Sequence, residues 1–356
     1  MKDYQIALIP GDGIGLEVTP EGVRVLDAVA EVTGDFRMHY TSFPWGCQYY
    51  LETGRMMPED GTDILKPYDA LYFGAVGLPA KVPDHISLRD LLIRLRMEFD
   101  QYICLRPCRL LPGVKSPLAG RKPGDIDMVI VRENTEGEYS GCGGLSHPGM
   151  PMEAALETSV VTRAGAERVI RSSFDLAMKR KKRLICVTKS NAQRHTMTLW
   201  DRCFADVARE YPEVATEYML VDAMAARMIL RPETIDVAVA SNLFGDILTD
   251  VGGAISGSLG IAPSANINPE RRFPSMFEPV HGSAPDIMGK GIADPIAMIW
   301  TGGMMLDFLG HGEAAGLIEK AITAVTEEGT SLGPDLGGSA STTQITDAII
   351  AKIRAM

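Results

Sequence analysis

The sequence has no apolar run that approaches the ~18–20 residues a helix needs to cross a membrane. Its N-terminal segment, Met1 to Pro10, contains only a short apolar stretch and lacks the small-residue cleavage site that follows a signal peptide. Both absences argue against a membrane-anchored or secreted protein. We therefore predict a soluble, cytoplasmic protein.

Cysteine is sparse and shows no pattern. The six cysteines, at positions 47, 104, 108, 142, 186 and 203, form no CxxC pair and no zinc-finger spacing. The sequence therefore lacks the usual signatures of a structural zinc site or a thioredoxin-like redox site. We interpret the six residues as buried free thiols of a protein in a reducing compartment.

An excess of positive charge is also missing, because 46 acidic residues outnumber 35 basic ones and leave a net charge of −11. This balance argues against a nucleic-acid or anionic-membrane partner, which would need a positive face. An acidic protein that binds an anionic substrate must instead concentrate its arginines locally. At 356 residues, the chain also exceeds the roughly 250–300 residues at which a single core stops growing, so two domains are expected.

Short β-branched runs alternate with longer amphipathic segments, which is typical of an α/β protein with a largely parallel sheet. The first strand, Ile6 to Ile9, leads into the glycine-rich turn Gly11-Asp12-Gly13-Ile14-Gly15 and then into a helix over residues 17–30. The turn matches neither a Walker A loop nor GxGxxG. Of its two interpretations, a phosphate loop and a sharp strand-to-helix turn, the second is favoured.

Two aspartates follow a strand predicted over Asp236 to Ala240. Asp246 and Asp250 are four residues apart, so on a helix they share one face. Their mutual repulsion would be relieved by a divalent ion, and carboxylate oxygens suit Mg²⁺ or Mn²⁺. The alternative is that Asp246 favours the first helical turn and Asp250 is a solvated surface residue.

Arginines gather near the ends of predicted elements. Arg96 lies on a helix predicted over Leu88 to Tyr102, Arg106 follows that helix, and Arg132 ends the strand that begins at Met128. Their donor forks suit the two carboxylates of a small dicarboxylic acid, whereas the alternative is a network of local ion pairs. On the same helix face as Arg96 the spacing places three further residues, Arg89, Leu92 and Ile93.

Three later segments carry polar residues beyond apolar runs. The strand over 184–188 leads to Lys189, an apolar run over 218–221 leads to Asp222, and a glycine-containing loop follows Glu278. The basic run Lys179 to Arg183 resembles a localisation signal, but we interpret it as the cationic end of a helix.

The order and spacing of these motifs resemble the β-decarboxylating dehydrogenases of malate-type 2-hydroxy acids: isopropylmalate, isocitrate, homoisocitrate, tartrate and D-malate dehydrogenases. The likeness spans nearly the whole chain. The tartrate and D-malate branch is indicated by three motifs, Asp84-His85-Ile86-Ser87-Leu88, Arg132-Glu133-Asn134-Thr135-Glu136-Gly137-Glu138-Tyr139 and Ile261-Ala262-Pro263-Ser264-Ala265-Asn266.

The resemblance implies an α/β, two-domain, isopropylmalate-dehydrogenase-like fold with an open cleft, not a classical Rossmann domain. Residues 1–103 and 257–356 would form the cofactor-binding domain. Residues 104–256 would form a second domain that carries the metal and substrate site and the interface of a homodimer. No nucleic-acid or membrane partner is expected.

Carried over by position, the resemblance also assigns the site. Arg96, Arg106 and Arg132 would bind the substrate carboxylates, with Arg89, Leu92 and Ile93 nearby. Asp246 and Asp250 would hold Mg²⁺ or Mn²⁺ together with Asp222, which would come from the neighbouring subunit, as would Lys189. The cofactor NAD would contact ten residues: Ile14, Asn191, His281, Gly282, Ser283, Ala284, Asp286, Ile287, Asp294 and Asp335. A monovalent cation such as K⁺ is a further requirement that the sequence leaves open.

In the implied mechanism, Lys189, with Asp222, removes the proton of the 2-hydroxyl group while hydride passes to NAD. CO₂ then leaves, and Tyr139 protonates the resulting enolate. The Asp286–Ile287 pair matches NAD-using members of the family, because a carboxylate there would repel the 2′-phosphate of NADP.

The preferred acid is harder to predict. Asp90 and Leu92 replace the Ser and Asn of isocitrate enzymes, and Ile93 replaces the arginine of homoisocitrate enzymes. Arg89 departs both from the Glu of isopropylmalate enzymes and from the Trp of the tartrate and D-malate branch. It either reads an extra polar group on the substrate or pairs with a surface acid. Asp294 and Cys104 also depart from the family, whose members commonly have Asn at both positions.

We predict an NAD-dependent oxidative decarboxylase of D-malate, forming pyruvate and CO₂, or of tartrate. The alternative substrate is 3-isopropylmalate. Two other classes fit less well: a metal-dependent phosphatase built on the same aspartates, and a non-catalytic regulatory subunit, which would usually have lost Tyr139, Lys189 or the aspartates.

Overall fold

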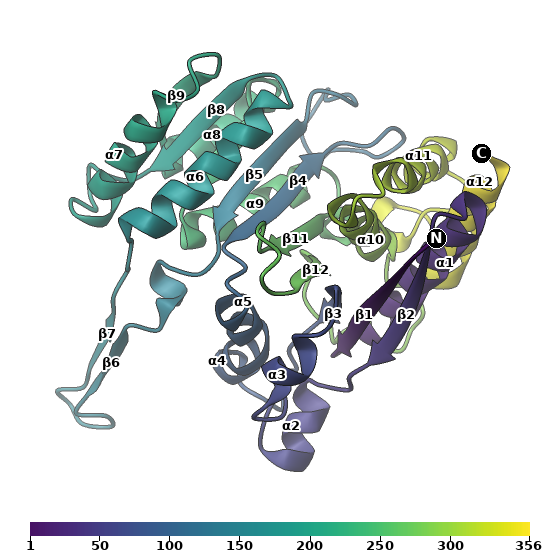
Figure 1. Ribbon diagram of the computed structural model, residues 1–356, viewed down its shortest axis with the longest axis horizontal. Coiled ribbons are helices and arrows are strands. Elements are labelled where there is room, and N and C mark those ends of the chain that lie inside the picture. The colour runs from purple at the N-terminus through teal and green to yellow at the C-terminus, as the bar shows by residue number, and fades with distance from the viewer. The chain divides into compact units, whose positions relative to one another are not determined.

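The computed structural model describes residues 1–356, and its internal contacts divide the chain into two compact units. Unit 1 comprises Met1–Gln101, Arg106–Ile126 and Gly252–Met356. Unit 2 comprises Tyr102–Leu105 and Asp127–Val251. Figure 1 shows the N- and C-terminal segments side by side in unit 1.

Unit 1 contains five neighbouring strands in the order β2-β1-β3-β12-β11. Their bounds are β1 Lys2–Gly11, β2 Phe36–Ser42, β3 Ala70–Ala75, β11 Pro263–Ile267 and β12 Ser275–Pro279. The pairs β1–β2, β1–β3 and β3–β12 are parallel, and only β11–β12 is antiparallel. Because β3 is buried along its whole length, it is continuously apolar rather than alternating.

The helices of unit 1 pack largely against one another and against this sheet. They are α1 Gly15–Thr33, α2 Cys47–Thr53, α3 Gly61–Leu65, α4 Asp84–Ser87, the π-helical turn η1 Leu88–Ile93, α5 Arg94–Glu98, the 3₁₀ turns η4 Leu259–Ile261 and η5 Pro334–Leu336, α10 Ile296–Leu309, α11 Gly312–Glu328 and α12 Thr342–Ala355. The nearly all-apolar α10 is buried on most sides, since α1, α11 and strands β11 and β12 contact it.

Unit 2 is built on the parallel strands β5-β10-β8-β9, namely β5 Asp127–Glu133, β8 Arg183–Thr188, β9 Ala215–Leu220 and β10 Val237–Ala240. Strand β4, Ile103–Arg109, has residues in both units. The helices are α6 Arg163–Met178, α7 Thr196–Ala208, α8 Val221–Leu230, and the 3₁₀ turns η2 Glu138–Ser140 and η3 Pro232–Thr234. Helix α9, Asn242–Ile255, also has residues in both units, because unit 2 ends at Val251.

A two-stranded hairpin projects from unit 2 (Figure 1). Strands β6, Gly143–Ser146, and β7, Ala154–Glu157, pair with each other antiparallel and with no other strand. An isolated hairpin is marginally stable in water, and this one exposes Leu145 and Leu156. These two apolar side chains are therefore left uncovered within the chain.

The structure confirms the first strand and helix and the strand that precedes Asp246. The helix predicted over 88–102 is wrong in its bounds: helical structure begins at Asp84, widens into the π-helical turn η1 and ends at Glu98. The end is early because Asp100 adopts a left-handed backbone conformation, with φ of 45°, which stops the helix.

The basic run closes a helix, as predicted. Helix α6 ends at Met178 and β8 begins at Arg183. Arg180 Nε donates to Asp236 Oδ1 at 2.8 Å, and Lys182 pairs with Glu213. These cations are therefore neutralised within unit 2.

Residues 106–126 belong to unit 1 by their internal contacts. The boundaries predicted from the sequence placed them in the second domain. Gly113 lies directly on α11, where an added Cβ would be 1.8 Å from Thr326 O. Ser116 Oγ also donates to Ile255 O at 2.6 Å. These close backbone contacts hold the segment to unit 1.

All six cysteines are free, and five are buried; the exception is the exposed Cys142. No helix combines the length and the apolar composition that crossing a membrane requires.

Candidate functional site

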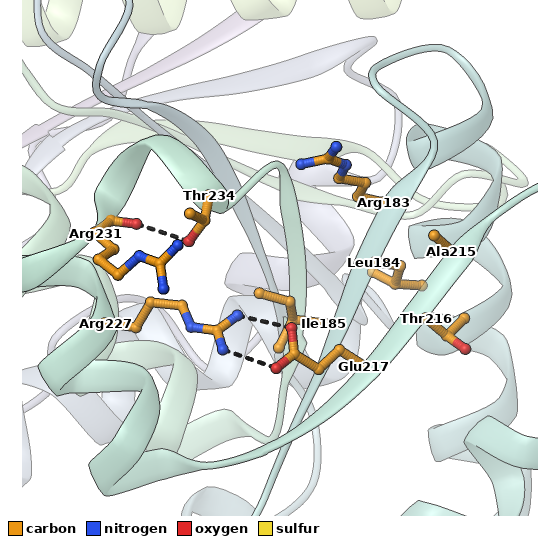
Figure 2. Close-up of a pocket in the computed structure, with 9 residues that line it drawn as sticks. All are labelled: Arg183, Leu184, Ile185, Ala215, Thr216, Glu217, Arg227, Arg231 and Thr234. Atoms are coloured by element: carbon orange, nitrogen blue, oxygen red, sulfur yellow. Dashed lines mark hydrogen bonds and ion pairs between the residues drawn. The ribbon is translucent and has the colours of Figure 1, made fainter.

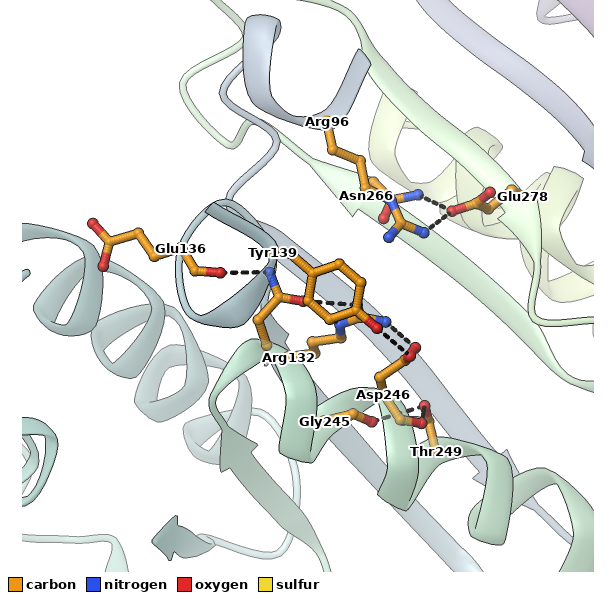
Figure 3. A network of polar contacts seen from close by, with 10 residues as sticks. Arg96, Arg132, Glu136, Tyr139, Gly245, Asp246, Thr249, Asn266 and Glu278 are labelled. Atoms are coloured by element: carbon orange, nitrogen blue, oxygen red, sulfur yellow. Dashed lines mark hydrogen bonds and ion pairs between the residues drawn. The ribbon is translucent and has the colours of Figure 1, made fainter. Parts of the chain in front are cut away.

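Strand β5 places Arg132 at the centre of a polar cluster in unit 2 (Figure 3). Its side chain is 1% exposed. Nε and Nη2 donate to Asn242 Oδ1 at 2.9 and 2.7 Å. Nη1 donates to Asp246 Oδ1. Tyr139 OH donates to the other oxygen of Asp246 at 2.9 Å, and the Tyr139 ring lies 5.2 Å from the guanidinium. Two predicted site residues and a predicted metal ligand thus form one cluster.

The backbone explains why these side chains meet. Strands β5 and β10 are parallel and pair Arg132 with Ala240, so the helix that follows β10 begins beside Arg132. Gly245 allows α9 to approach closely, since a Cβ there would be 2.6 Å from Arg132 Cβ.

Glu133 organises the loop between Arg132 and Tyr139. Its carboxylate accepts hydrogen bonds from Thr135 N, Thr135 Oγ1 and Glu136 N at 2.8 to 2.9 Å. Burial raises the pKa of Glu133 even though these donors favour the ionised form. The loop that carries Tyr139 is therefore held at its start by one buried side chain.

Asp246 and Asp250 both lie on α9, at the predicted spacing of one helical turn. Their carboxylate oxygens are the donor type that Mg²⁺ and Mn²⁺ prefer. One chain brings together no group of three or more His, Cys, Asp or Glu residues that could hold a metal, so Asp222 does not join these two aspartates within the chain. The donor set fits a divalent metal only if another chain or the substrate completes it.

Lys189 and Asp222 form a separate pair in unit 2. Lys189 Nζ donates to Asp222 Oδ1 at 2.6 Å, and the Asp222 side chain is 67% exposed. The hydrogen bond from Lys189 lowers the pKa of Asp222. Both side chains come from the carboxyl-end side of neighbouring strands, Lys189 directly after β8 and Asp222 in the first turn of α8 after β9. Asn191, two residues after Lys189, is exposed.

In unit 1, Arg96 is buried against an acid that the sequence did not single out as its partner. Arg96 Nη2 donates to Glu278 Oε1 at 2.6 Å, and Asn266 Nδ2 donates to the same oxygen at 2.7 Å (Figure 3). The Nε of Arg96 is buried with no partner, so this guanidinium retains a donor for a ligand. Arg106, on β4, is 5% exposed.

The three other residues predicted near the substrate, Arg89, Leu92 and Ile93, lie on the π-helical turn and differ in exposure. Arg89 is exposed, Ile93 is half-buried, and Leu92 is 9% exposed within an apolar cluster that includes Leu91 and Leu95. Leu92 therefore contributes to the core of unit 1. Single π-helical turns occur frequently at functional sites.

The glycine-rich turn after β1 anchors a second loop. Ile14 N donates to Ser283 O at 2.8 Å, and Gly13, at φ 57°, lies so close that a Cβ would be 2.0 Å from that oxygen. Asp12 accepts hydrogen bonds from Cys47 N and Gly77 N at 2.8 and 2.9 Å. The turn is thus a structural junction, as the favoured interpretation predicted, and it brings two predicted cofactor contacts together.

The loop after β12 offers features that suit a bound ligand. The Nε2 of His281 is buried without a hydrogen-bond partner, and burial lowers the pKa of this imidazole. Gly282 is exposed with no atom near a hypothetical Cβ, and Ala284 has a strained φ of 39°. Asp286 is exposed and Ile287 is half-buried. An unpartnered ring nitrogen beside an open glycine fits the predicted dinucleotide.

Asp294 and Asp335 form a carboxyl pair in unit 1. Asp294 is 6% exposed; its Oδ1 accepts from Ile296 N at 2.8 Å, and its Oδ2 has no donor. Burial raises the pKa of Asp294 well above its usual value, and the nearby Asp335 raises it further. Ser258 Oγ donates to Asp335 Oδ2.

The sequence did not identify Asn242, Glu278 or Glu133. One signal was present for Asn242, which follows strand β10 as Lys189 follows β8.

A cavity of about 310 Å³ lies between β8, β9 and the end of α8 (Figure 2). It is lined by arginines and by Glu217, which pairs with Arg227, and no predicted site residue lines it.

A family model described as isocitrate/isopropylmalate dehydrogenase matches residues 5–349. The chain is 55% identical over 350 residues to a probable tartrate dehydrogenase/decarboxylase from Agrobacterium vitis, covering 98% of this chain and 97% of that protein. It is 54% identical over 355 residues to D-malate dehydrogenase [decarboxylating] from Escherichia coli K12, covering 98% of each. Among solved structures, isocitrate dehydrogenase from Methylococcus capsulatus matches with a TM-score of 0.88 and 34% identity over 99% of both chains.

Proposed function

Because the chain belongs to the isocitrate/isopropylmalate dehydrogenase family, we propose that it oxidises and decarboxylates D-malate or tartrate, with NAD as the hydride acceptor. Membership confirms the predicted family and the α/β fold class. The relatives at 53–55% identity are decarboxylating dehydrogenases by name, which supports this choice among the acids used in the family.

The observation that carries the proposal is the cluster of Arg132, Tyr139 and Asp246. It combines a buried cation, a phenol and a carboxylate in direct contact, all three held by unit 2. A cation to bind a carboxylate, a weak acid to deliver a proton and an oxygen ligand for a metal are what decarboxylation of a 3-carboxy-2-keto acid needs.

The chain's residues would divide the work as follows. Arg132 and Arg96 bind substrate carboxylates through their guanidinium groups, and Arg106 assists them. Lys189 Nζ, as a neutral amine, takes the proton of the 2-hydroxyl group and becomes an ammonium that the carboxylate of Asp222 orients and stabilises. Tyr139 OH gives a proton to the carbon that loses CO₂. Bound NAD would supply the hydride acceptor, and a divalent metal would supply electrophilic stabilisation of the developing oxyanion.

Cofactor binding would use the loop after β12. His281, Gly282, Ser283 and Ala284 form the part nearest Ile14, and the unpartnered Nε2 of His281 is available to the dinucleotide. The exposed carboxylate of Asp286 disfavours the 2′-phosphate of NADP by charge repulsion, so NAD is the expected form. A requirement for K⁺ stays open.

The metal site would be shared between two chains of a homodimer. Asp246 and Asp250 offer two oxygen ligands, and no third acid joins them within one chain. Asp222 and Lys189 are paired with each other and exposed enough to reach a second chain. A second copy that contributes both residues completes the set.

The first experiment measures NADH formation with Mn²⁺ for D-malate, meso-tartrate, L-tartrate, 3-isopropylmalate and isocitrate. We expect the highest kcat/KM for D-malate or a tartrate. A preference for 3-isopropylmalate would replace this substrate assignment with the alternative. Absence of turnover on all five acids, with NAD bound, would contradict the proposed reaction.

Arg89 is the residue to vary for substrate choice. It is exposed on the π-helical turn. If Arg89 binds a hydroxyl or carboxylate group of the substrate, Arg89→Ala should lower kcat/KM for tartrate, which has an additional hydroxyl group, more than for D-malate. Equal effects on the two acids would assign Arg89 to the surface instead.

A further inference from the structure

Asn242, the first residue of α9, is 1% exposed and uses both ends of its side-chain amide. Oδ1 accepts from Arg132 Nε and Nη2 at 2.9 and 2.7 Å, and Nδ2 donates to Glu136 O at 3.0 Å. One side chain therefore connects strand β5, helix α9 and the loop that leads to Tyr139.

The hydrogen bonds from Arg132 to Asn242 fix the orientation of the guanidinium but do not neutralise its charge. Two N–H groups on one edge of the guanidinium share a single acceptor, which sets the plane of the group. Asn242 is neutral, so it orients Arg132 without compensating its positive charge, whereas Asp246 places a carboxylate against the guanidinium. A carboxylate at position 242 would hold the same geometry but reduce the attraction of Arg132 for an anionic ligand.

Asn242 also lies close to the backbone of the loop over residues 134–139. Gly137 has φ of 75°, and a Cβ there would be 3.2 Å from Asn242 Cβ, so the backbone passes directly over the Asn242 side chain. Glu133 holds the preceding residues at Thr135 and Glu136. The loop is thus fixed at two points before Tyr139.

We propose that Asn242 is a positioning residue that sets the orientation of Arg132 and the place of the 134–139 loop together. This rests on the proposed function, in which Arg132 binds a substrate carboxylate and Tyr139 delivers a proton. Asn242 touches neither substrate nor cofactor in this scheme. It acts through the two residues that do.

A double-mutant cycle tests the action through Arg132. Asn242→Ala is expected to raise the KM of the preferred acid about tenfold or more, because an unclamped guanidinium loses its preset geometry. The Kd of NAD, measured by fluorescence titration, should change less than about twofold. In an Arg132→Lys background the same Asn242→Ala change should have little further effect on KM. Additive effects in the two backgrounds would contradict positioning through Arg132.

Hydrogen–deuterium exchange tests the action on the loop without any turnover. Asn242→Ala should speed exchange of the amides of residues 134–139 and leave the amides of β8 unchanged. Asn242→Asp is the second variant, should the alanine variant fold poorly. It keeps the acceptor for Arg132 and loses the donor to Glu136 O, so it should speed exchange in the same loop and raise KM. Unchanged loop exchange in both variants would overturn the proposal.

Ser173→Ala is the matched structural control. Ser173 is fully buried in unit 2, and its hydroxyl donates to Val169 O within α6, away from Arg132. It should lower thermal stability without changing KM or loop exchange. If wild-type protein turns over none of the acids, the proposed reaction fails, whereas the exchange measurement still decides the role of Asn242.

Discussion

The two best-defined arginines are buried in different electrostatic settings. Arg96 faces the carboxylate of Glu278 at 2.6 Å, which an amide from Asn266 also contacts. Arg132 is held by the neutral amide of Asn242 and by Asp246. A buried cation is tolerated only when paired and hydrogen-bonded, and both residues meet that condition through a carboxylate partner. A carboxylate partner thus balances each buried guanidinium, and Arg132 is also oriented by a neutral amide.

The buried carboxyl of Asp294 leads to a prediction about pH and stability. Its native pKa lies above its unfolded value because of burial and then Asp335, so the native state keeps a proton that the unfolded chain has lost. This costs stability increasingly as pH rises above about 4 toward the native pKa. Asp294→Asn replaces the proton with an N–H that Asp335 can accept at every pH.

We expect the Tm of Asp294→Asn to rise relative to wild type as pH increases from about 5 to about 8. The difference in Tm between the variant and wild type should grow by roughly 2–4 °C over this range, the effect of about 1 kcal/mol in a domain of 150–250 residues. Differential scanning calorimetry across this range makes the measurement. A Tm difference independent of pH would mean that Asp294 is ionised in the native protein.

The reactive residue types could be predicted from the sequence, but their partners could not. Lys189, Tyr139 and Arg132 were identified because each follows or ends a strand or belongs to a recognisable motif. Glu278 and Asn242 were not, since a partner 182 or 110 residues away in the chain leaves no local signal. The Lys189–Asp222 contact was implied only by resemblance, and the structure shows it directly.

Among the secondary-structure elements, α9 depends on one close approach to β5. Gly245→Ala would place a methyl group 2.6 Å from Arg132 Cβ, so the helix or the strand must shift. We expect a loss of about 1–3 kcal/mol in the free energy of unfolding, the usual cost of overpacking. Substrate KM should rise as well, because the displaced strand carries Arg132. Denaturant unfolding and steady-state kinetics measure the two effects.

Gly316→Ala is the comparison for that variant. Gly316 lies inside α11 with no atom near a hypothetical Cβ and no positive φ. Alanine should therefore stabilise the helix by up to about 1 kcal/mol through propensity alone. If Gly245→Ala behaved like Gly316→Ala, α9 would not be packed on Arg132 as described.

The elements themselves were largely predictable, because burial on both faces produces continuous apolar strands such as β3 and β10. The π-helical turn was not. It changes the backbone hydrogen-bond spacing over Leu88–Ile93 without a characteristic composition, so the simple helical face predicted for Arg89, Leu92, Ile93 and Arg96 does not hold. Leu92 joins the core instead.

For the whole molecule, unit 2 exposes apolar side chains that a monomer would be expected to cover. Leu145 and Leu156 on the hairpin are 64% and 61% exposed, and Ile247 on α9 is 53% exposed. Exposed apolar groups of this size commonly mark association surfaces. A twofold dimer would bury the same surface from both copies, and it would bring the Lys189–Asp222 pair of each chain to the site of the other.

Mixing two inactive variants tests that arrangement. In the proposed dimer each site uses Asp246 of one chain and Lys189 of the other, so Lys189→Met and Asp246→Asn each inactivate both sites of their homodimers. Random re-association makes about half of the dimers mixed, and each mixed dimer has one intact site of two. We therefore expect about one quarter of wild-type activity after the variants are unfolded and refolded together. If every site were built from one chain, no activity would return.

The control for this experiment is a mixture of Lys189→Met with Asp222→Asn. These two residues contact each other at 2.6 Å within one chain and would enter the same site together. In a mixed dimer one site then lacks Lys189 and the other lacks Asp222, so no intact site forms. Recovery with Asp246→Asn but not with Asp222→Asn would place Lys189 and Asp222 on one side of the dimer interface and Asp246 on the other. Recovery in both mixtures would instead mean that Asp222 is dispensable, and the shared metal site would lose its third ligand.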